Sequence, residues 1–214
     1  MNPSPVDILL VEDHAVVRAG LRRLLEARPG MRVVAETDSG EAAGRLYAQH
    51  RPTMMVIDLS LPGISGLEVV RRIVARDPKA RILVFTMHRS TLLVRRVLEA
   101  GALGYVLKEA GADVLVEAVD RVARGKLYLG PIIAQDVALE HLKGTENLLS
   151  TLSPREFEIL RLVAEGKNTA MIAEQLHLST KTVSNNISRI KTRLGITSTT
   201  EMVLLAIRTG LISP

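Results

Sequence analysis

Five short apolar segments, separated by longer stretches with helical periodicity, constrain the fold of the first half of the chain. Each segment is too short for a helix and lies near polar or turn residues, as buried parallel strands do. The expected strands are 8–11, 33–35, 54–59, 82–85 and 105–107. Between them, apolar residues recur at helical spacing, as Val17, Leu21 and Leu24 do. Strand–helix alternation repeated five times predicts an α/β doubly wound fold with a five-stranded parallel sheet.

Charged and hydroxyl side chains stand at the ends of four of these segments. Glu12 and Asp13 follow the first, Asp58 ends the third, Thr86 follows the fourth and Lys108 follows the fifth. In doubly wound sheets, ligands bind beyond the carboxyl ends of the strands, so these side chains are expected to converge. Each acid taken alone is more often a solvated loop charge, but their joint placement favours a site.

Such a cluster has a definite chemistry. Clustered carboxylates repel one another, and oxygen ligands without cysteine favour a hard cation, which we expect to be Mg²⁺. A carboxylate can also accept a phosphoryl group. The metal and a lysine would then offset the charge of the group in transfer.

The sequence around these positions resembles the receiver domain of response regulators over about residues 5–125. The similar motifs are 11–14 (VEDH), 58–68 (DLSLPGISGLE) and 104–108 (GYVLK). The resemblance implies that Asp58 is the phosphorylated residue. It implies a set of metal ligands comprising Glu12, Asp13, Asp58 and the carbonyl of Ser60. It implies phosphoryl-contacting and switch residues, namely Thr86, Lys108 and Tyr105, with the Tyr105 ring turning inward on phosphorylation.

The middle of the chain is predicted to connect two domains. Gly125, Gly130, Pro131 and Gly144 punctuate it, and apolar residues between 132 and 142 predict a short helix. Residues 143–150 are polar enough for a flexible linker. The expected division is a domain at 1–125, a connector at 126–150 and a second domain at 151–214.

The second domain is expected to contain four helices. The segment 153–156 combines a Ser cap, Pro at the first helical position and Glu at the third. Ser179 is expected to cap a third helix over 180–194, and Ser198 with Glu201 a fourth over 199–209. The third helix has a narrow apolar stripe and an opposite face of small polar and basic residues, which suits the major groove of DNA.

This half of the chain resembles the LuxR-type helix-turn-helix, and the whole chain resembles NarL/FixJ-type response regulators. The residues that carry the resemblance are 152–156, 181–183 and 193–196. The resemblance makes 180–194 the recognition helix. Its DNA-binding candidates are Lys181, Thr182, Ser184, Asn185, Ser188, Arg189, Lys191 and Arg193.

The last helix is apolar almost all round from Met202 to Ile207. One face must serve the domain core, and an exposed apolar remainder often marks a protein interface. The resemblance points to a homodimer on paired half-sites. The candidate dimerisation residues are Met202, Val203, Leu205 and Ala206. In the alternative interpretation, both faces are buried within one monomer.

Composition excludes several classes of function. There is no cysteine, so disulfides, thiolate metal sites and cysteine nucleophiles are absent. Aromatic residues make up 2% of the chain, which argues against a stacking platform for single-stranded nucleic acid. No apolar run approaches the ~20 residues of a membrane span, and the amino terminus does not resemble a secretory signal. We expect a cytoplasmic protein without a membrane partner.

Together these patterns predict a two-component response regulator. A sensor histidine kinase would phosphorylate Asp58, and the change would control binding to double-stranded DNA and transcription. We expect no enzymatic activity beyond assistance to its own phosphotransfer and dephosphorylation. One alternative is a phosphorylation-independent DNA-binding regulator that uses the first domain as a dimerisation module. Another is a signalling adaptor or phosphate sink.

Overall fold

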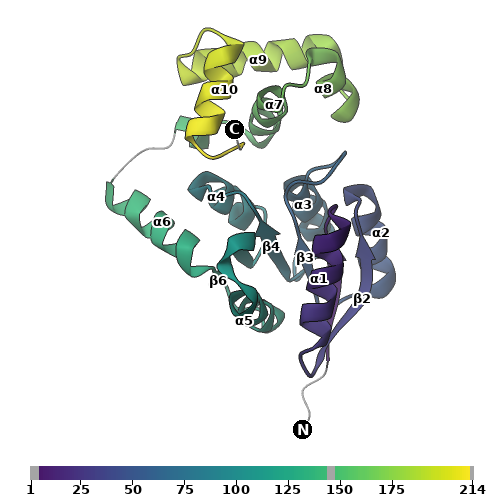
Figure 1. Ribbon diagram of the computed structural model, residues 1–214. Coiled ribbons are helices and arrows are strands. Elements are labelled where there is room, and N and C mark those ends of the chain that lie inside the picture. Colours follow the sequence, from purple (N-terminus) through teal and green to yellow (C-terminus); the bar gives the residue numbers. More distant parts are fainter. Residues whose placement is uncertain (1–4, 144–147, 213–214) are drawn as a thin grey trace. The chain divides into compact units, whose positions relative to one another are not determined.

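The computed structural model describes residues 5–143 and 148–212. The chain forms two compact units (Figure 1). One comprises Met1–Met87 and Val94–Ala138, and the other comprises His88–Leu93 and Leu139–Pro214.

The first unit contains a parallel sheet. Its strands are β1 (Val6–Val11), β2 (Met31–Thr37), β3 (Met54–Ile57), β4 (Ile82–Thr86), β5 (Gly104–Leu107) and β6 (Tyr128–Leu129). Their order is β2-β1-β3-β4-β5-β6, and every neighbouring pair is parallel. The doubly wound α/β class is confirmed, but the predicted count of five strands is wrong. The two-residue strand β6 is too short to carry an apolar pattern, and it forms through main-chain pairing with β5.

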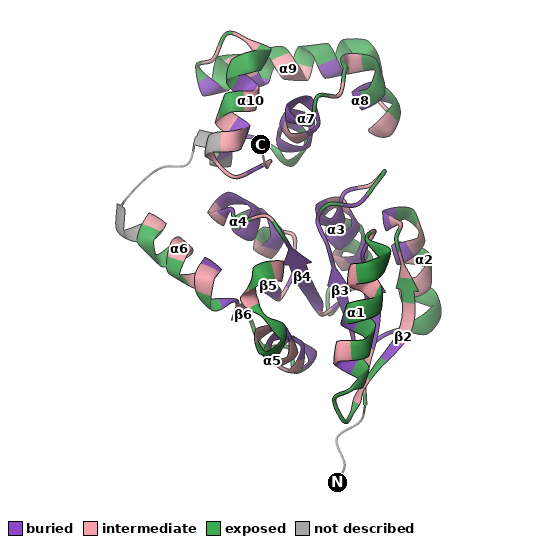
Figure 2. Cartoon of the chain, in the orientation of Figure 1, coloured by how far each residue is buried: buried purple, intermediate pink, exposed green. Residues whose placement is uncertain are grey.

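Helices connect these strands and cover both faces of the sheet. They are α1 (Ala15–Glu26), α2 (Gly40–His50), α3 (Gly66–Arg76), α4 (Thr91–Glu99) and α5 (Ala112–Ala123), with a short 3₁₀ helix η1 at Lys108–Ala110. Ile8, Val56 and Leu83 pack in one cluster with apolar residues of α1 and α5. Successive residues of a strand point to opposite faces of the sheet. The residues next to these three in the strands are also buried, so the second face of the sheet is covered as well (Figure 2). A sheet covered on both sides explains why its inner strands β3, β4 and β5 are fully buried and almost wholly apolar.

The predicted connector helix is present as α6 (Pro131–Lys143). Within the predicted polar linker, residues 144–147 lie outside the described residues. The chain resumes with a short 3₁₀ helix, η2, at Leu148–Thr151.

The second unit contains the four expected helices, α7 (Pro154–Ala164), α8 (Thr169–Gln175), α9 (Thr180–Leu194) and α10 (Thr199–Arg208). Their starts follow the local signals in the sequence. Ser153 and Glu156 form a reciprocal capping box at α7, and Ser179 and Ser198 accept hydrogen bonds from the first turns of α9 and α10. The helix proposed to enter the groove therefore has its predicted bounds.

Candidate functional sites

Asp58 lies just beyond the end of β3 and is only 3% exposed. Its Oδ1 accepts hydrogen bonds from the backbone amides of Leu59, at 2.6 Å, and Ser60, at 3.3 Å. Its Oδ2 accepts a hydrogen bond from Lys108 Nζ at 2.7 Å. The carboxylate is therefore held by donors on both of its oxygens, which fixes its orientation.

Lys108 begins η1, immediately after β5, and connects two acids that are far apart in the sequence. Its Nζ lies 2.6 Å from Glu12 Oε2 as well as 2.7 Å from Asp58 Oδ2. Burial disfavours the charged ammonium, but hydrogen bonds and attraction from Asp58 and Glu12 outweigh that effect and raise the pKa of Lys108. A charged lysine thus lies between two buried carboxylates and compensates their repulsion.

Glu12, Asp13 and His14 form a cluster that can hold a metal ion, with one ligand atom from each within 4.8 Å of the others. Asp13 Oδ1 is buried and accepts no hydrogen bond among the described residues, although His14 Nδ1 lies only 2.7 Å away. The negative charge of Asp13, with the hydrogen bond to Glu12, raises the pKa of His14. The adjacent carboxylates of Glu12 and Asp13 supply the oxygen ligands that a hard divalent cation prefers, so this cluster fits such an ion.

Thr86 and Tyr105 lie on the neighbouring strands β4 and β5, and both are fully buried. Burial, with the nearby charge of Asp58, raises the pKa of Tyr105, so its phenol is neutral over the physiological range. The switch hypothesis has the Tyr105 ring turning inward on phosphorylation. The structure shows the ring already in the inward position.

Two features of this site were not identified from the sequence. His14 contacts both acids of the cluster, and its place directly after them was the available signal. Gly66 begins α3 so close to β3 that a Cβ there would lie 2.0 Å from the carbonyl oxygen of Asp58. Only glycine permits that approach, which packs the start of α3 against the residue after β3.

The predicted DNA-binding residues lie on α9, and most of them point into solvent (Figure 2). The exposed ones are Lys181, Thr182, Ser184, Asn185, Ser188, Arg189 and Arg193, whereas Lys191 is half-buried. Val183, Ile190 and Leu194 bury the opposite face of the helix.

Arg193 differs from the other candidates because its side chain pairs with a residue of another helix, α7. Its guanidinium lies 2.6 Å from Glu156 Oε2 and donates a hydrogen bond to the carbonyl oxygen of Thr151 at 3.2 Å. The structure therefore ties Arg193 to the start of α7, a role that its sequence position did not reveal.

The predicted dimerisation residues on α10 are only partly accessible. Met202 and Ala206 are fully buried, which corrects their expected place on an open surface. These two residues serve the core because α10 packs against α7. Val203 and Leu205 are half-buried, and Leu204, which was not predicted, is 47% exposed.

The fold and these two sites define a receiver domain joined to a helix-turn-helix domain, and comparison with known proteins agrees. Residues 8–120 match the family described as "Response regulator receiver domain", and residues 150–206 match "Bacterial regulatory proteins, luxR family".

Relatives match along nearly the whole chain. "Response regulator UvrY" of Escherichia coli (strain K12) is 38% identical over 208 residues, which are 96% of this chain and 95% of that protein. "Transcriptional activator protein ExaE" of Pseudomonas putida is 40% identical over 208 residues, which are 96% and 97% of the two chains. A structure of the Salmonella typhimurium RcsB response regulator has a TM-score of 0.79 at 26% identity, covering 97% of this chain and 100% of that one.

The chain belongs to the NarL/FixJ family of two-component response regulators. It is a transcription regulator with a LuxR-type DNA-binding domain, as the sequence predicted. Among the helices described, none combines the length and the apolar character needed to cross a membrane.

Proposed function

We propose that a sensor histidine kinase phosphorylates Asp58 and that this modification controls how α9 binds DNA. The observation that carries the proposal is the buried Asp58 carboxylate, oriented by two backbone amides and by Lys108. A carboxylate oxygen would attack phosphorus, the bond from phosphorus to the donor histidine nitrogen would break, and an acyl phosphate would form. We also propose that the protein works in the cytoplasm, where its DNA would be.

The pocket residues have separate roles in this proposal. Glu12, Asp13, Asp58 and the Ser60 carbonyl would hold Mg²⁺, which supplies positive charge to the transferring group. The Lys108 ammonium would move from its bridge between two carboxylates to the new phosphoryl oxygens, because these carry more charge. The Thr86 hydroxyl would donate a hydrogen bond to the same phosphoryl group. The buried Tyr105 ring would change position in response to this movement of Thr86.

Phosphorylation is tested with the full-length protein and a radiolabelled small phosphodonor, with Mg²⁺ present. Asp58→Asn removes the acceptor, so we expect label on the wild type and none on the variant. The control is Asp113→Asn, since Asp113 has a 96% exposed side chain in the same domain. DNA affinity is then measured on a fragment selected by the wild type. If donor treatment changes wild-type and Asp58→Asn affinity equally, the phosphorylation-independent alternative holds.

The DNA-binding role of α9 predicts two distinct effects. Lys181→Ala and Arg189→Ala are expected to weaken binding to every sequence and to reduce the slope of log affinity against log salt by about 1 each. Asn185→Ala is expected to cost about 1–3 kcal/mol on the preferred sequence and much less on others. Titrations on the selected and a scrambled fragment at several salt concentrations measure both. Uniform loss in Asn185→Ala would reject it as a base reader.

We further propose a homodimer on DNA that uses the exposed part of α10. Leu204, with the half-buried Val203 and Leu205, supplies the apolar surface. A structure of the similar protein RcsB contains two RcsB dimers bound to two parallel DNAs, which supports this arrangement. Leu204→Glu is expected to prevent dimer formation in sedimentation on DNA while leaving the monomer folded, and persistence of the dimer would contradict the proposal.

A further inference from the structure

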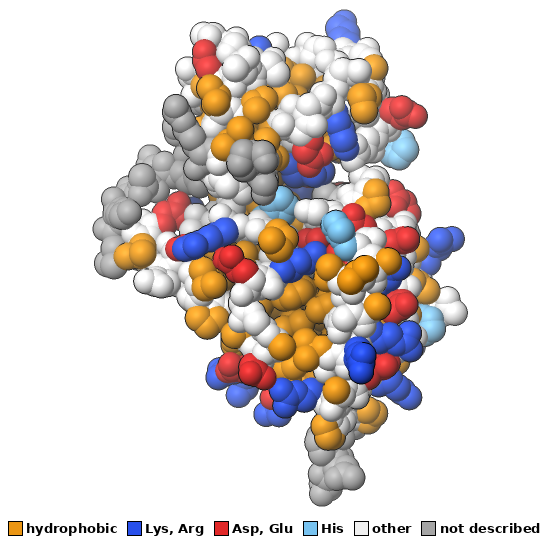
Figure 3. Space-filling view, in the orientation of Figure 1, with side chains coloured by type: hydrophobic (Ala, Val, Ile, Leu, Met, Phe, Trp, Pro, Cys, Tyr) orange, Lys and Arg blue, Asp and Glu red, His pale blue; other side chains and the backbone are white. Residues whose placement is uncertain are grey.

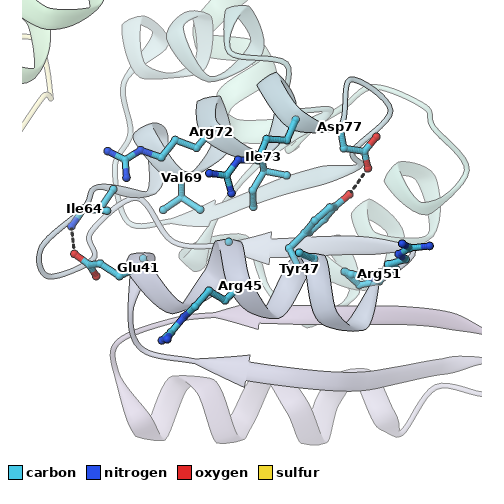
Figure 4. Close-up of a pocket in the computed structure, with 14 residues that line it drawn as sticks. Glu41, Arg45, Tyr47, Arg51, Ile64, Val69, Arg72, Ile73 and Asp77 are labelled. Carbon is cyan, nitrogen blue, oxygen red and sulfur yellow. Dashed lines mark hydrogen bonds between the residues drawn. The ribbon is translucent and has the colours of Figure 1, made fainter.

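A groove of about 650 Å³ lies between α2 and α3 of the receiver domain (Figure 4). Its size falls in the range of roughly 300–1,000 Å³ that small-molecule sites occupy. Glu41 and Ile64 lie at one end of the view in Figure 4, and Tyr47 and Asp77 lie at the other. None of its lining residues belongs to the proposed phosphorylation pocket.

The wall of this groove is largely apolar. Val69 and Ile73 of α3 lie between its two ends, and the Tyr47 ring extends from α2 toward α3 (Figure 4). Gly44 lines the groove from α2, and a Cβ added there would have nothing within 4 Å. The groove is therefore open at Gly44 because that residue has no side chain.

The two carboxylates of the groove are engaged within the chain. Glu41 Oε1 accepts a hydrogen bond from the amide of Ile64 at 3.2 Å. Asp77 Oδ2 accepts one from the Tyr47 hydroxyl at 3.0 Å, and Asp77 Oδ1 accepts one from the amide of Lys79, also at 3.0 Å. These bonds stabilise the walls and occupy acceptors that would otherwise attract the basic side chains.

Four arginines line the same groove, Arg45, Arg51, Arg72 and Arg76. Arg72 pairs with Glu68 at 2.8 Å. The other three make no ion pair or side-chain hydrogen bond with any residue in 5–143 or 148–212. This groove thus combines an apolar wall with four arginines and two carboxylates, and of these arginines only Arg72 has an ion-pair partner among the described residues. Figure 4 shows Arg45 pointing away from α3 and Arg51 at the end where Tyr47 and Asp77 lie. On the face of the receiver domain that Figure 3 shows, acids and bases are interspersed.

We propose that this groove binds a small organic phosphate with an aromatic or other apolar body. The apolar wall and the Tyr47 ring would contact the body, and the unpaired Arg76 guanidinium would bind the phosphate, for which its planar donor arrangement is suited. Four arginines against two carboxylates in the lining leave an excess of positive charge, which favours an anionic ligand. This site lies apart from Asp58 and does not depend on phosphorylation there.

Phenylphosphonate is the probe, because it has an aromatic body and a dianionic head and cannot donate a phosphoryl group to Asp58. Its binding to the full-length protein is measured by calorimetry and located by amide chemical-shift changes. We expect a dissociation constant of about 1 mM or tighter, with shifts on α2 and α3. Benzoate is expected to bind several-fold more weakly, and benzyl alcohol and inorganic phosphate weaker still.

Two matched pairs of variants test the location. Gly44→Leu fills the groove without a backbone clash and is expected to abolish binding, whereas Gly20→Leu on α1, where an added Cβ also meets nothing within 4 Å, is expected to preserve it. Replacing glycine within a helix favours folding in both, which thermal unfolding confirms. Arg76→Ala is expected to weaken binding at least about threefold, by loss of a charged donor, and Arg23→Ala on α1 is expected to have no effect.

Several outcomes would overturn the proposal. These are the absence of shifts on α2 and α3, equal binding of benzyl alcohol and phenylphosphonate, or unchanged binding in Gly44→Leu. Binding of an acidic, phenylalanine-containing peptide in the groove, with none of phenylphosphonate, would instead indicate a protein partner. Because Asp58→Asn leaves the groove intact, the same titration on that variant separates this proposal from the phosphorylation mechanism.

Discussion

In the receiver domain, Glu12 and Asp58 of the proposed site are buried, whereas in the second domain most of the proposed DNA contacts lie in solvent. Glu12 is 2% and Asp58 is 3% exposed, and Lys108 pairs with both. Lys181, Asn185 and Arg189 on α9 are all exposed. Chemistry on a small group needs donors and charges fixed in advance. A helix that meets DNA keeps its polar groups hydrated until the phosphates and bases replace the water.

The second domain also contains a buried acid, and it serves the fold. Glu156 is 5% exposed, closes the capping box at α7 and pairs with Arg193. Burial opposes its charge, but the hydrogen bonds with Ser153 and the charges of Arg193 and Arg189 prevail and lower the pKa of Glu156. Buried charge therefore belongs to the proposed reaction site in one domain and to a structural contact in the other, and the partners of each acid distinguish the two.

The largest expected effect comes from removing the charge that compensates the receiver pocket. Lys108→Met would leave Glu12 and Asp58 facing each other without a cation, so we expect a loss of about 3–5 kcal/mol in the free energy of unfolding. Urea unfolding followed by circular dichroism measures it. Mg²⁺ is expected to restore part of the loss, because a cation again neutralises the two carboxylates.

The control for Lys108→Met is Lys126→Met, since Lys126 is exposed. Equal stability of the two variants at neutral pH would show that the pocket tolerates uncompensated acids.

The raised pKa of Lys108 also determines how the stability of the domain depends on pH. The contribution of Lys108 to the free energy of unfolding is fully present below its ordinary pKa of 10.5. It is lost only as pH rises through the higher pKa that Lys108 has in the folded protein.

Arg193→Ala tests whether this arginine belongs to the fold or to the DNA interface. Glu156 would lose its charged partner, and we expect a loss of roughly 1–2 kcal/mol in unfolding free energy, reduced by the partial exposure of Arg193. The salt dependence of DNA binding is expected to stay as in the wild type. Arg189→Ala is the matched comparison. We expect it to lower the salt slope of DNA binding and to cost less stability than Arg193→Ala, because Arg189 acts on Glu156 only through its charge.

The contribution of Glu156 also depends on pH. Because its pKa is lowered in the folded protein, its stabilisation is present above the ordinary value of 4.5 and is lost as pH falls through the lower folded value. The difference between wild type and Arg193→Ala is therefore expected to shrink in that acidic range. A lower salt slope with unchanged stability in Arg193→Ala would instead place Arg193 on a DNA phosphate.

The smallest effect expected is that of Ser153→Ala. The Ser153 hydroxyl accepts a hydrogen bond from the amide of Glu156 at 3.3 Å, and losing this cap is expected to cost about 1 kcal/mol. Ser184→Ala, in the exposed middle of α9, is expected to change stability by less than about 0.5 kcal/mol. Thermal unfolding of both variants measures the difference, and similar midpoints would show that α7 does not depend on its cap.

Local signals in the sequence determined the helices of the second domain and the strands β1 to β5. The bounds of α9 follow from the Ser179 cap and from Gly195, which ends the helix with φ of +65°. Such signals act over a few residues and do not depend on the rest of the fold. The edge where Glu12, Asp58 and Lys108 meet was also predictable, because the carboxyl ends of parallel strands share one side of a sheet.

Only the tertiary structure decided which side chains these elements place in contact. It buried Met202 and Ala206 against the domain core, paired Arg193 with Glu156, added β6 beside β5 and placed the arginines of α2 and α3 around one groove. Each of these contacts is between residues of different helices or strands, and the periodicity within one element does not predict it. Distances across elements are set by packing, because a side chain's partner depends on how whole helices and strands fit together.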